Sequence, residues 1–428
     1  MRIEPAGTIV GHIAVPGDKS ISHRAVLIGS LSEGETRVHG FGRSGDTEAT
    51  VRALRALAVE IEDVSDDELI VHGVGLRGLR PPGEPIDCGN AGTLMRLLTG
   101  ILAGQSGRFE LTGDESLRSR PMDRVAEPLA RMGGQIETDN GLPPLVVEGS
   151  DELRAIDYSL PVASAQVKSA ILLAALNAEG RTTVVEPAPT RDHTELMLAA
   201  AGAHVRRRPS SVSIEPAGSL ELGEVTVPGD FSAAAPFIVA ATLLAGSELT
   251  IHDLGLNPLR TGLLDVLERM GARVAVFNRR KHGGEWIGDL EIRAAELVST
   301  EITAEEVPRL VDELPLFALA AAFARGESRV RGAGELRVKE TDRIETVANG
   351  LRTLGVRVRA SDDGFGVKGV PSRPKGGGMG SAGDHRIAML AAVAGLVSRE
   401  GVDVGDAEAA AISFPGFFDL VEAVAQRG

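Results

Sequence analysis

The sequence of 428 residues is poor in cysteine, in aromatic side chains and in long apolar runs. Its one cysteine, Cys88, has no partner for an internal disulfide or for a zinc site, which is typical of a reducing compartment. Aromatic residues make up 3%, which leaves little material for stacking bases. The most apolar stretch, 233–246, contains Pro236 and falls short of the ~18 uninterrupted apolar residues of a membrane span. We therefore expect no membrane partner and a cytoplasmic protein.

Basic residues are outnumbered by acidic residues. The chain carries 45 Lys and Arg against 60 Asp and Glu, a formal net charge of −15. An acidic protein repels a phosphate polymer, so we expect no nucleic-acid partner. Glycine, in contrast, is abundant with 52 residues, which indicates a turn-rich globular chain. At about 150 residues per domain, the length predicts two or three domains.

The chain is internally repeated. Val15-Pro-Gly-Asp-Lys-Ser20 recurs as Val227-Pro-Gly-Asp-Phe-Ser232, at an offset of 212 residues from 15 to 227, which indicates two similar halves. Within the halves, an amphipathic helix, a Gly or Ala stop and a short strand recur together. The copies that carry this pattern are 54–61, 129–136, 198–205, 267–274 and 351–358, and a sixth helix is expected at 417–425. In four copies the stop is a glycine, as at many helix C-termini.

Three other predicted helices, 169–176, 233–244 and 316–323, are apolar nearly all round. This pattern is typical of helices buried between sheets rather than packed on a surface. The sequence therefore predicts an α/β fold of two similar domains, each made of three repeats, with a cleft between the domains.

Several polar segments stand at predicted helix starts and carry Lys or Arg. Gly17–Arg24 and Cys88–Arg96 each place small residues before a helix, where backbone N–H groups and a following cation can bind an anion. Arg118 and Arg120 precede another helix start, and 161–169 is polar amid apolar residues. Each segment taken alone is explained equally well by ordinary helix capping and solvated side chains. Together, these cations suit a small polyanionic ligand.

Acidic residues raise a similar choice. Asp312 precedes an apolar helix and is either an N-cap or a general base. The segment 336–343 packs five charged residues into eight, which indicates either a solvated face or a site, and 383–387 is equally ambiguous. Cys88 lacks a neighbouring base, which favours a small buried residue over a nucleophile. Asp312 and Glu340 are the candidates for proton transfer.

Eight segments, in order and across nearly the whole chain, resemble one family. They are Gly17–Arg24, Gly89–Thr93 with Arg96, Arg120-Pro121, Ser164–Gln166, Asp312-Glu313, Arg337–Arg343, Asp384–Arg386 and Ser413–Pro415. The sequence resembles the 5-enolpyruvylshikimate-3-phosphate synthases of the enolpyruvyl transferase family. The resemblance implies transfer of the enolpyruvyl group of phosphoenolpyruvate to the 5-hydroxyl of shikimate 3-phosphate, through a tetrahedral intermediate and with release of phosphate.

The resemblance also implies an architecture and a set of site residues. Each domain would contain three βαβαββ units, with domain I formed by residues 1–15 and 228–428 and domain II by residues 16–227. We expect a monomer that uses no cofactor and no metal. The implied catalytic residues are Asp312, Glu340 and Lys19. The implied shikimate 3-phosphate ligands are Lys19, Ser20, Arg24, Ser164, Ala165, Gln166, Thr190, Arg191, Asp312 and Lys339. The implied phosphoenolpyruvate ligands are Lys19, Gly92, Arg120, Gln166, Arg343 and Arg386.

Some positions depart from the commoner family pattern. Ala165 stands where a second Ser is frequent, Thr190 and Arg191 stand where Ser and Tyr often contact the shikimate, and Ile412 stands where many members have Lys.

Three alternatives remain open. A UDP-N-acetylglucosamine enolpyruvyl transferase usually has a loop Cys that 112–120 lacks, an RNA 3′-phosphate cyclase fits the charge poorly, and a non-catalytic anion-binding protein requires Asp312 and Glu340 to be mere caps.

Overall fold

The computed structural model describes residues 1–427, and its chain groups into two compact units. Unit 1 contains Met1–Pro16, Pro228–Arg280 and the chain from Trp286 onward, while unit 2 contains Gly17–Val227 and Lys281–Glu285. These units differ from the domain boundaries expected from the sequence at Pro16 and at Lys281–Glu285. In the latter segment, Glu285 pairs with His193, with 2.6 Å between Oε1 and Nδ1.

Unit 2 repeats one order of elements. Its helices are α1 (Lys19–Leu31), α2 (Gly45–Ala56), α3 (Gly92–Leu102), α4 (Glu115–Arg118), α5 (Asp123–Arg131), α6 (Ala165–Ala175) and α7 (His193–Ala200). Its strands are β3 (Glu35–His39), β4 (Glu60–Asp63), β5 (Glu68–His72), β6 (Ile86–Asp87), β7 (Arg108–Thr112), β8 (Gln135–Asp139), β9 (Leu142–Glu148), β10 (Asp157–Ser159), β11 (Thr182–Val185), β12 (Val205–Arg208), β13 (Ser211–Ile214) and β14 (Glu224–Thr226).

Unit 1 has related elements. Its α-helices are α8 (Phe231–Leu243), α9 (Gly262–Arg269), α10 (Leu314–Phe323), α11 (Arg343–Thr353), α12 (His385–Val397) and α13 (Phe417–Val424), and its 3-10 helices are η1 (Val307–Arg309), η2 (Gly334–Val338) and η3 (Ala407–Ile412). Its strands are β1 (Arg2–Ile3), β2 (Thr8–Ile13), β15 (Glu248–Gly255), β16 (Arg273–His282), β17 (Glu285–Arg293), β18 (Glu301–Ile302), β19 (Gly326–Val330), β20 (Arg357–Ser361), β21 (Gly364–Gly369), β22 (Gly377–Gly380), β23 (Val402–Gly405) and β24 (Ala425–Gln426).

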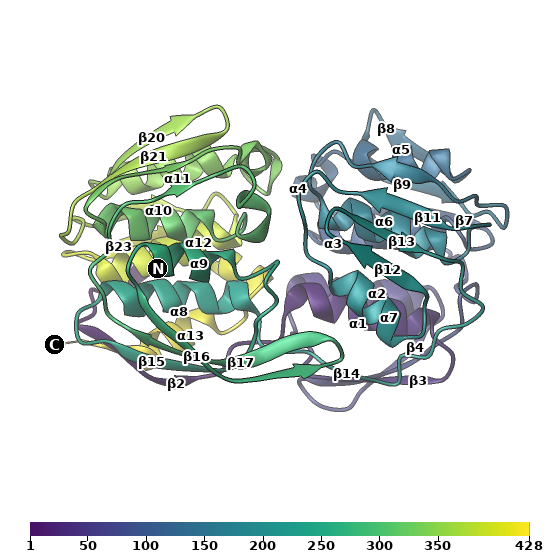
Figure 1. Ribbon diagram of the computed structural model, residues 1–428, viewed down its shortest axis with the longest axis horizontal. Helices are drawn as coiled ribbons and strands as arrows, with labels where there is room; N and C mark the ends of the chain where they lie inside the picture. Colours follow the sequence, from purple (N-terminus) through teal and green to yellow (C-terminus); the bar gives the residue numbers. More distant parts are fainter. Residues whose placement is uncertain (428) are drawn as a thin grey trace. The chain divides into compact units, whose positions relative to one another are not determined.

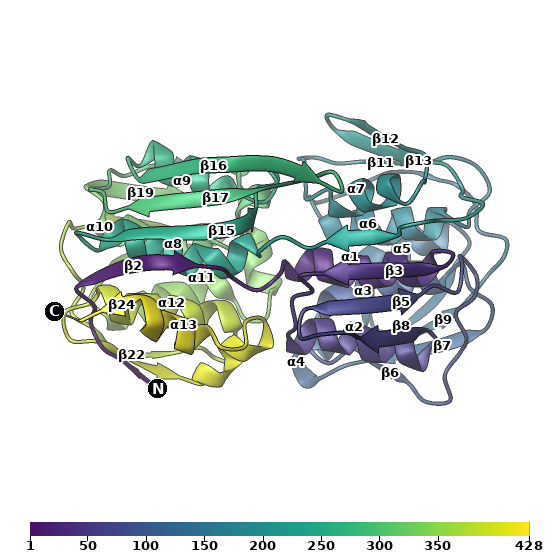
Figure 2. The same cartoon turned by 90° about the horizontal axis from the view of Figure 1, so that it is seen from below.

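The sheets confirm the repeated α/β architecture. In the described residues, unit 2 has the sheets β14-β3-β5-β4, β6-β7-β9-β8 and β10-β11-β13-β12. Each sheet joins a parallel pair to an antiparallel hairpin, as in β10-β11 followed by β13 and β12. Unit 1 repeats this order in β18-β19-β21-β20 and in β2-β15-β17-β16, and Figure 2 shows the latter four strands side by side. Such an order follows from a βαβαββ unit.

The last repeat is shorter than the expected βαβαββ unit. Its strands β22 and β23 are parallel, but its third neighbour is β1 from the start of the chain. After α13 the chain ends in β24, which pairs with β2. The N-terminal residues therefore complete the sheet that the final repeat leaves unfinished.

One apolar helix of each repeat lies in the core of its unit, as the apolar segments predicted. In unit 1, α8, α10 and α12 are almost wholly buried, and Figure 1 shows α10 and α8 between β20 and β21 on one side and β15 and β2 on the other. In unit 2, α1, α3 and α6 fill the same role. Because these helices are held between sheets, the N-terminal turn of each has a fixed place.

The predicted helix stops are also confirmed. Gly133, Gly202, Gly271 and Gly355 have φ of 93°, 93°, 96° and 88°, in the left-handed region that favours glycine. Ala58 takes the same conformation in the first copy, with φ of 69°. Among the helices of the described residues, none is long and apolar enough to cross a membrane.

Candidate active site

The first helix of unit 2 begins with the Gly-Asp-Lys-Ser segment singled out above. Asp18 caps α1 by accepting a hydrogen bond from the Ile21 backbone N–H at 2.9 Å. Lys19, the first residue of the helix, places its Nζ 2.7 Å from Oδ2 of Asp46 in the first turn of α2. The helix start therefore holds a lysine whose position is set by a second helix.

Arg24 lies one turn further along α1 and is 3% exposed. Its guanidinium donates to Thr194 Oγ1 on α7 at 2.7 Å, to Ser169 Oγ on α6 at 3.0 Å and to the Ser20 carbonyl at 2.9 Å. These three acceptors are neutral oxygens. Burial lowers the pKa of Arg24 to about 10, and the positive charge of Arg191 acts in the same direction, so the group stays cationic at neutral pH.

A second cluster of cations surrounds the start of α3. Arg120 donates to Asn90 Oδ1 at 2.7 Å and to Ser116 Oγ at 3.1 Å, and Arg96 donates to Gln166 Oε1 at 2.7 Å. Gly92 begins α3 between the two arginines. A Cβ on Gly92 would lie 3.0 Å from Arg96 Nη1 and 3.3 Å from Arg120 Nη1. The absence of a side chain at Gly92 therefore leaves room beside two guanidinium groups.

Helix α6 connects the two clusters of unit 2. Ser164 is its N-cap and accepts from the Val167 N–H, and Ala165 is its first residue. Gln166 bonds Arg96 and also donates to Thr93 Oγ1 at 2.8 Å, while Ser169 accepts from Arg24. Residues three apart share one face of a helix. The same face of α6 therefore contacts both groups of cations.

Thr190 and Arg191 depart from the family pattern, and contacts within unit 2 hold the segment 190–195. The hydroxyl of Thr190 donates to Glu186, so that oxygen faces a carboxylate. Arg207 donates to Asp192, and Lys168, which is buried, places Nζ 2.7 Å from Oε1 of Glu195. The positive charge of Arg191 acts to lower the pKa of Arg24.

The expected residues of unit 1 gather around the carboxylate of Asp312. Arg343 Nη1 lies 3.5 Å from its Oδ1, Arg386 Nη2 lies 3.8 Å from its Oδ2, and Lys339 Nζ lies 4.0 Å from its Oδ1. Glu340 joins the group because its Oε2 accepts from Arg343 Nη2 at 2.6 Å. Residues from a loop, from the segment after η2 and from the starts of α11 and α12 thus converge in one unit.

Arg343 is the most deeply buried cation of this group. Its Nε and Nη2 donate to the two oxygens of Asp384 at 2.7 and 3.0 Å. Burial acts to lower the pKa of Arg343, but the charges of Asp384 and Glu340 outweigh burial and raise that pKa. Burial likewise acts to raise the pKa of Asp384, and the charge of Arg343 outweighs it and lowers that pKa. Both groups are therefore ionised at neutral pH.

The structure decides several alternatives that the sequence left open. Asp312 is not an N-cap, because Glu313 occupies that position of α10, and Glu313 makes no capping bond through its side chain. The segment 336–343 is not a wholly solvated face, since Arg343 is 1% exposed. Cys88 is buried, and burial raises the pKa of its thiol, which fits a structural residue rather than a nucleophile.

Among the residues that sequence reasoning missed are two ion-pair partners of the expected ones. Asp46 pairs with Lys19, and its signal is faint: an acid in the first turn of a helix that Ser44 caps. Arg260 Nη1 lies 3.4 Å from Oδ2 of Asp312, and Arg260 is 3% exposed. Its signal is an arginine that follows Asn257-Pro258, a pair typical of a helix start. Helix α9 in fact begins at Gly262.

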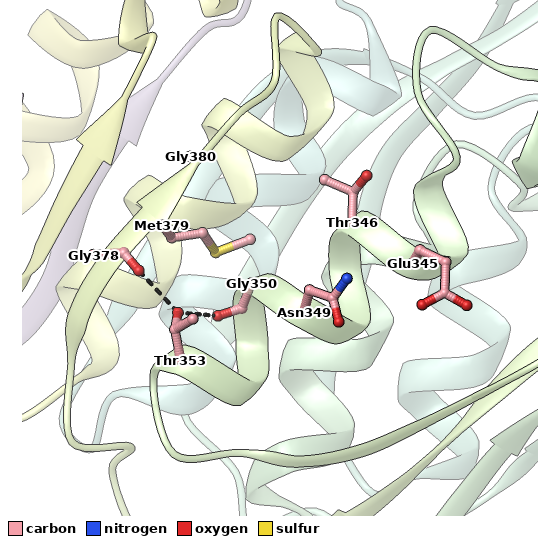
Figure 3. A pocket seen from close by; sticks show the side chains of 8 residues that line it. All are labelled: Glu345, Thr346, Asn349, Gly350, Thr353, Gly378, Met379 and Gly380. Carbon is pink, nitrogen blue, oxygen red and sulfur yellow. Dashed lines mark hydrogen bonds between the residues drawn. The ribbon is translucent and has the colours of Figure 1, made fainter.

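Two other features do not suit the expected ligands. A pocket of about 340 Å³ lies between α11 and β22 (Figure 3). The one charged residue of its lining is Glu345, and the Thr353 hydroxyl is bonded to the carbonyls of Gly350 and Gly378. Glu60, Glu62 and His72 could hold a cation on β4 and β5, but His72 and Glu62 already form a surface pair with 2.7 Å between Nε2 and Oε1. Neither place offers a cation for a phosphate or a carboxylate.

Comparison with known proteins identifies relatives of this chain over nearly its whole length. Residues 3–421 match the family model described as EPSP synthase (3-phosphoshikimate 1-carboxyvinyltransferase). A 3-phosphoshikimate 1-carboxyvinyltransferase of Alkalilimnicola ehrlichii is 51% identical over 420 residues, covering 98% of this chain and 94% of the relative. One from a Geobacter species is 49% identical over 427 residues and covers 99% of each chain.

Solved structures show the same likeness. An EPSP synthase from Acinetobacter baumannii has a TM-score of 0.88 and 42% identity, covering all of this chain and 98% of the other. The enolpyruvyl transferase NikO from Streptomyces tendae has a TM-score of 0.76 at 20% identity, which shows a shared fold. The match over nearly the whole chain, at about half identity, shows that this chain belongs to the EPSP synthase (3-phosphoshikimate 1-carboxyvinyltransferase) family.

Proposed function

We propose that the two units of this chain have different roles in the reaction of its family. The enzyme transfers the enolpyruvyl group of phosphoenolpyruvate to shikimate 3-phosphate, a step of the shikimate pathway of aromatic amino acid biosynthesis. The observation that carries this function is the family match over residues 3–421. In our proposal, unit 2 supplies most of the anion-binding groups and unit 1 supplies most of the groups that move protons.

The first set of roles concerns shikimate 3-phosphate. Its proposed ligands in unit 2 are Lys19, Ser20, Arg24, Ser164, Ala165, Gln166, Thr190 and Arg191. The arrangement that supports them is the buried cation Arg24, on a helix whose start Asp18 caps, with neutral oxygens as its hydrogen-bond acceptors. Guanidinium groups match the geometry of a phosphate oxygen pair. Thr190 is the weakest member, because its hydroxyl already donates to Glu186.

The second set concerns phosphoenolpyruvate. Lys19, Gly92, Arg120 and Gln166 are its proposed ligands in unit 2, with Arg343 and Arg386 in unit 1. The room above Gly92, next to Arg120, suits a carboxylate or phosphate, which would accept from the guanidinium. Arg343 is already held by Asp384, so it would meet the substrate with little reorganisation.

The proton transfers are assigned mainly to unit 1, with Lys19 of unit 2 as a candidate second donor to the methylene carbon. Asp312 accepts the proton of the 5-hydroxyl as that oxygen attacks C2 of phosphoenolpyruvate, and Glu340, alone or with Lys19, gives a proton to the methylene carbon. A tetrahedral intermediate results. Loss of phosphate from C2, with return of a proton from the new methyl group to the carboxylate of Glu340, then restores the vinyl group. Lys339, 4.0 Å from Asp312, is assigned to the shikimate 3-phosphate that Asp312 also contacts. The scheme needs neither a metal nor a cofactor.

The remaining expectations concern partners and location. We propose a monomer acting on small molecules in the cytoplasm, with no nucleic-acid or membrane partner. The net charge of −15 supports the first of these exclusions, since it disfavours binding to a phosphate polymer. A sedimentation measurement across a range of protein concentrations tests the monomer, because a self-associating chain would gain mass as the concentration rises.

The test of function is phosphate release from purified protein given phosphoenolpyruvate. One reaction contains shikimate 3-phosphate and a parallel reaction contains UDP-N-acetylglucosamine. We expect release with the first acceptor alone. Phosphate release with the second acceptor alone would mean that the chain is a UDP-N-acetylglucosamine enolpyruvyl transferase. No release with either acceptor would favour a binding protein.

A further inference from the structure

Asp312 is surrounded by more than its proposed substrate ligands. At least four cationic groups lie within 4.0 Å of its carboxylate: Arg260, Arg343, Arg386 and Lys339. Three of them are proposed to bind substrates, so their contacts with Asp312 change when substrates arrive. Arg260 has no such role and is 3% exposed.

Arg260 is held from its other side by the fold. Its Nη2 donates to Oδ1 of Asp230 at 3.0 Å. The same oxygen of Asp230 caps α8, because it accepts from the Ser232 backbone N–H at 2.7 Å. Ser232 in turn donates through its hydroxyl to Glu313, the neighbour of Asp312. The start of a buried helix therefore fixes the Asp312-Glu313 segment through two side chains.

The turn that carries Arg260 is itself fixed to the segment before Asp312. Asn257 builds the turn by accepting from the backbone N–H groups of Leu259, at 2.9 Å, and Arg260, at 2.8 Å. A Cβ on Gly262 would lie 2.9 Å from Cβ of Arg309, so only glycine allows this approach. Arg309 donates to the Pro258 carbonyl at 2.8 Å. The distance from Arg260 to Asp312 is thus set by backbone packing as well as by charge.

We propose that Arg260 is a positioning residue that keeps Asp312 ionised and aimed for the proton of the 5-hydroxyl while the other cations engage substrates. This inference rests on the proposed role of Asp312. A cation beside a carboxylate favours the charged form, and a fixed hydrogen-bond partner limits its rotation. The other charges that face this region are Arg343, Lys339 and Arg386 with the acids Glu340, Glu313 and Asp384, and none of them changes in an Arg260 variant.

The first variant removes the charge. In Arg260→Gln, we expect kcat to fall about 10- to 100-fold, because a misplaced base loses this much, with the KM for phosphoenolpyruvate nearly unchanged. The acid limb of the kcat/KM profile should move to higher pH by about one unit, since loss of an opposite charge disfavours the carboxylate. Arg260→Lys keeps the charge, so it should restore the acid limb and only part of kcat. Substrate ionisation is the same throughout, so differences report the enzyme.

A second variant moves the acid limb the other way. Asp230→Asn keeps a good helix cap but removes a negative charge from Arg260. We expect the acid limb of this variant to move to lower pH or stay in place, with a drop of a few-fold in kcat. General destabilisation would not shift two profiles in opposite directions. A shift to higher pH in Asp230→Asn would overturn the proposal.

The matched control is Arg309→Gln. Arg309 clamps the same turn, through Pro258 and through Asp265 at 2.6 Å, and its hydrogen bonds go to those residues rather than to Asp312. We expect a lower midpoint of thermal unfolding and an unchanged acid limb. If Arg309→Gln shifts the acid limb as Arg260→Gln does, Arg260 acts only through stability and the proposal is wrong.

The proposed roles of Asp312 and of Arg260 can be rejected separately. Full turnover in Asp312→Asn would remove the proposed role of Asp312, and the role of Arg260 with it. Loss of turnover in Asp312→Asn, together with a wild-type rate and pH profile in Arg260→Gln, would overturn the Arg260 inference alone. Should Arg260→Gln fold too poorly for kinetics, the carboxyl 13C shift of labelled Asp312 in Arg260→Lys and Asp230→Asn gives a readout of ionisation without turnover, and unchanged shifts in both would reject the proposal.

Discussion

Two buried arginines, one in each unit, differ in what surrounds them. Arg24 in unit 2 donates to two hydroxyls and a carbonyl, and burial lowers its pKa to about 10. Arg343 in unit 1 donates to Asp384 and Glu340, and those charges outweigh burial and raise its pKa. Burial penalises both cations, but only Arg343 receives compensating negative charge through its hydrogen bonds.

The difference indicates separate tasks. A buried cation bonded to neutral oxygens gains most from a ligand that brings negative charge, which suits Arg24 to a phosphate. A buried cation bonded to carboxylates has its charge compensated already, so it holds those carboxylates in place. The surroundings of Arg24 thus favour binding of an anion, and those of Arg343 favour positioning of acids and bases. Changes at Asp312 should mainly lower kcat, and changes at Arg24 should mainly raise KM.

The largest expected effect is that of Asp312→Asn. The variant keeps the size of the side chain and removes its ability to accept a proton. We expect kcat to fall by a factor of about 10² to 10⁴, the usual contribution of a general base, with an unchanged unfolding midpoint. Steady-state kinetics with both substrates and thermal unfolding measure the two effects.

Asp265→Asn is the control for that variant, because Asp265 is an exposed acid of unit 1 that pairs with Arg309. Its kcat should match the wild type. If Asp312→Asn loses affinity for shikimate 3-phosphate while keeping kcat, then Asp312 is a ligand only and the contrast between the units disappears.

A smaller effect is expected for Arg24→Lys in unit 2. Lysine keeps the charge but cannot reach Thr194, Ser169 and a phosphate with one planar fork. The KM for shikimate 3-phosphate should rise about 10-fold, which corresponds to the loss of about 1.4 kcal/mol of binding, and kcat should stay within a few-fold. Arg55→Lys, an exposed arginine of unit 2 paired with Asp63, is the control and should leave both constants alone. A fall in kcat at constant KM would contradict the assignment of binding to this unit.

The fold was largely predictable because its signals are local. The glycine stops at Gly133, Gly202, Gly271 and Gly355 and the apolar helices lie within single segments of the chain, where periodicity and turn chemistry act directly. The domain organisation left a signal as well, since the two Val-Pro-Gly-Asp segments lie at two of the four places where the chain passes between the units. The short final repeat was not foreseen, because its missing strand comes from the opposite end of the chain.

The site was predictable only in part, because its decisive contacts join distant residues. The resemblance named Asp312 and Arg343, but no sequence pattern says that Arg343 is bonded to Asp384, 41 residues away. Arg260 was missed for the same reason: its partners Asp230 and Asp312 lie 30 and 52 residues from it. The choice between an N-cap and a general base at Asp312 likewise needed the structure, because its neighbour Glu313 takes the N-cap position of α10.

The smallest expected effect is that of Gly92→Ala, which tests the phosphoenolpyruvate site proposed in unit 2. The added methyl group would stand 3.0 Å from Arg96 Nη1 and 3.3 Å from Arg120 Nη1, closer than ordinary contact, but both atoms are ends of flexible side chains that can shift by a few tenths of an ångström. Fold and kcat should therefore survive. The KM for phosphoenolpyruvate should rise by about two- to five-fold, less than 1.4 kcal/mol of binding, while the KM for shikimate 3-phosphate stays unchanged, because Arg24 lies in the other cluster. Gly83→Ala, where a Cβ has nothing within 4 Å, is the control in the same unit. An equal rise in both KM values would mean that the two clusters joined by α6 act as one anion site rather than two.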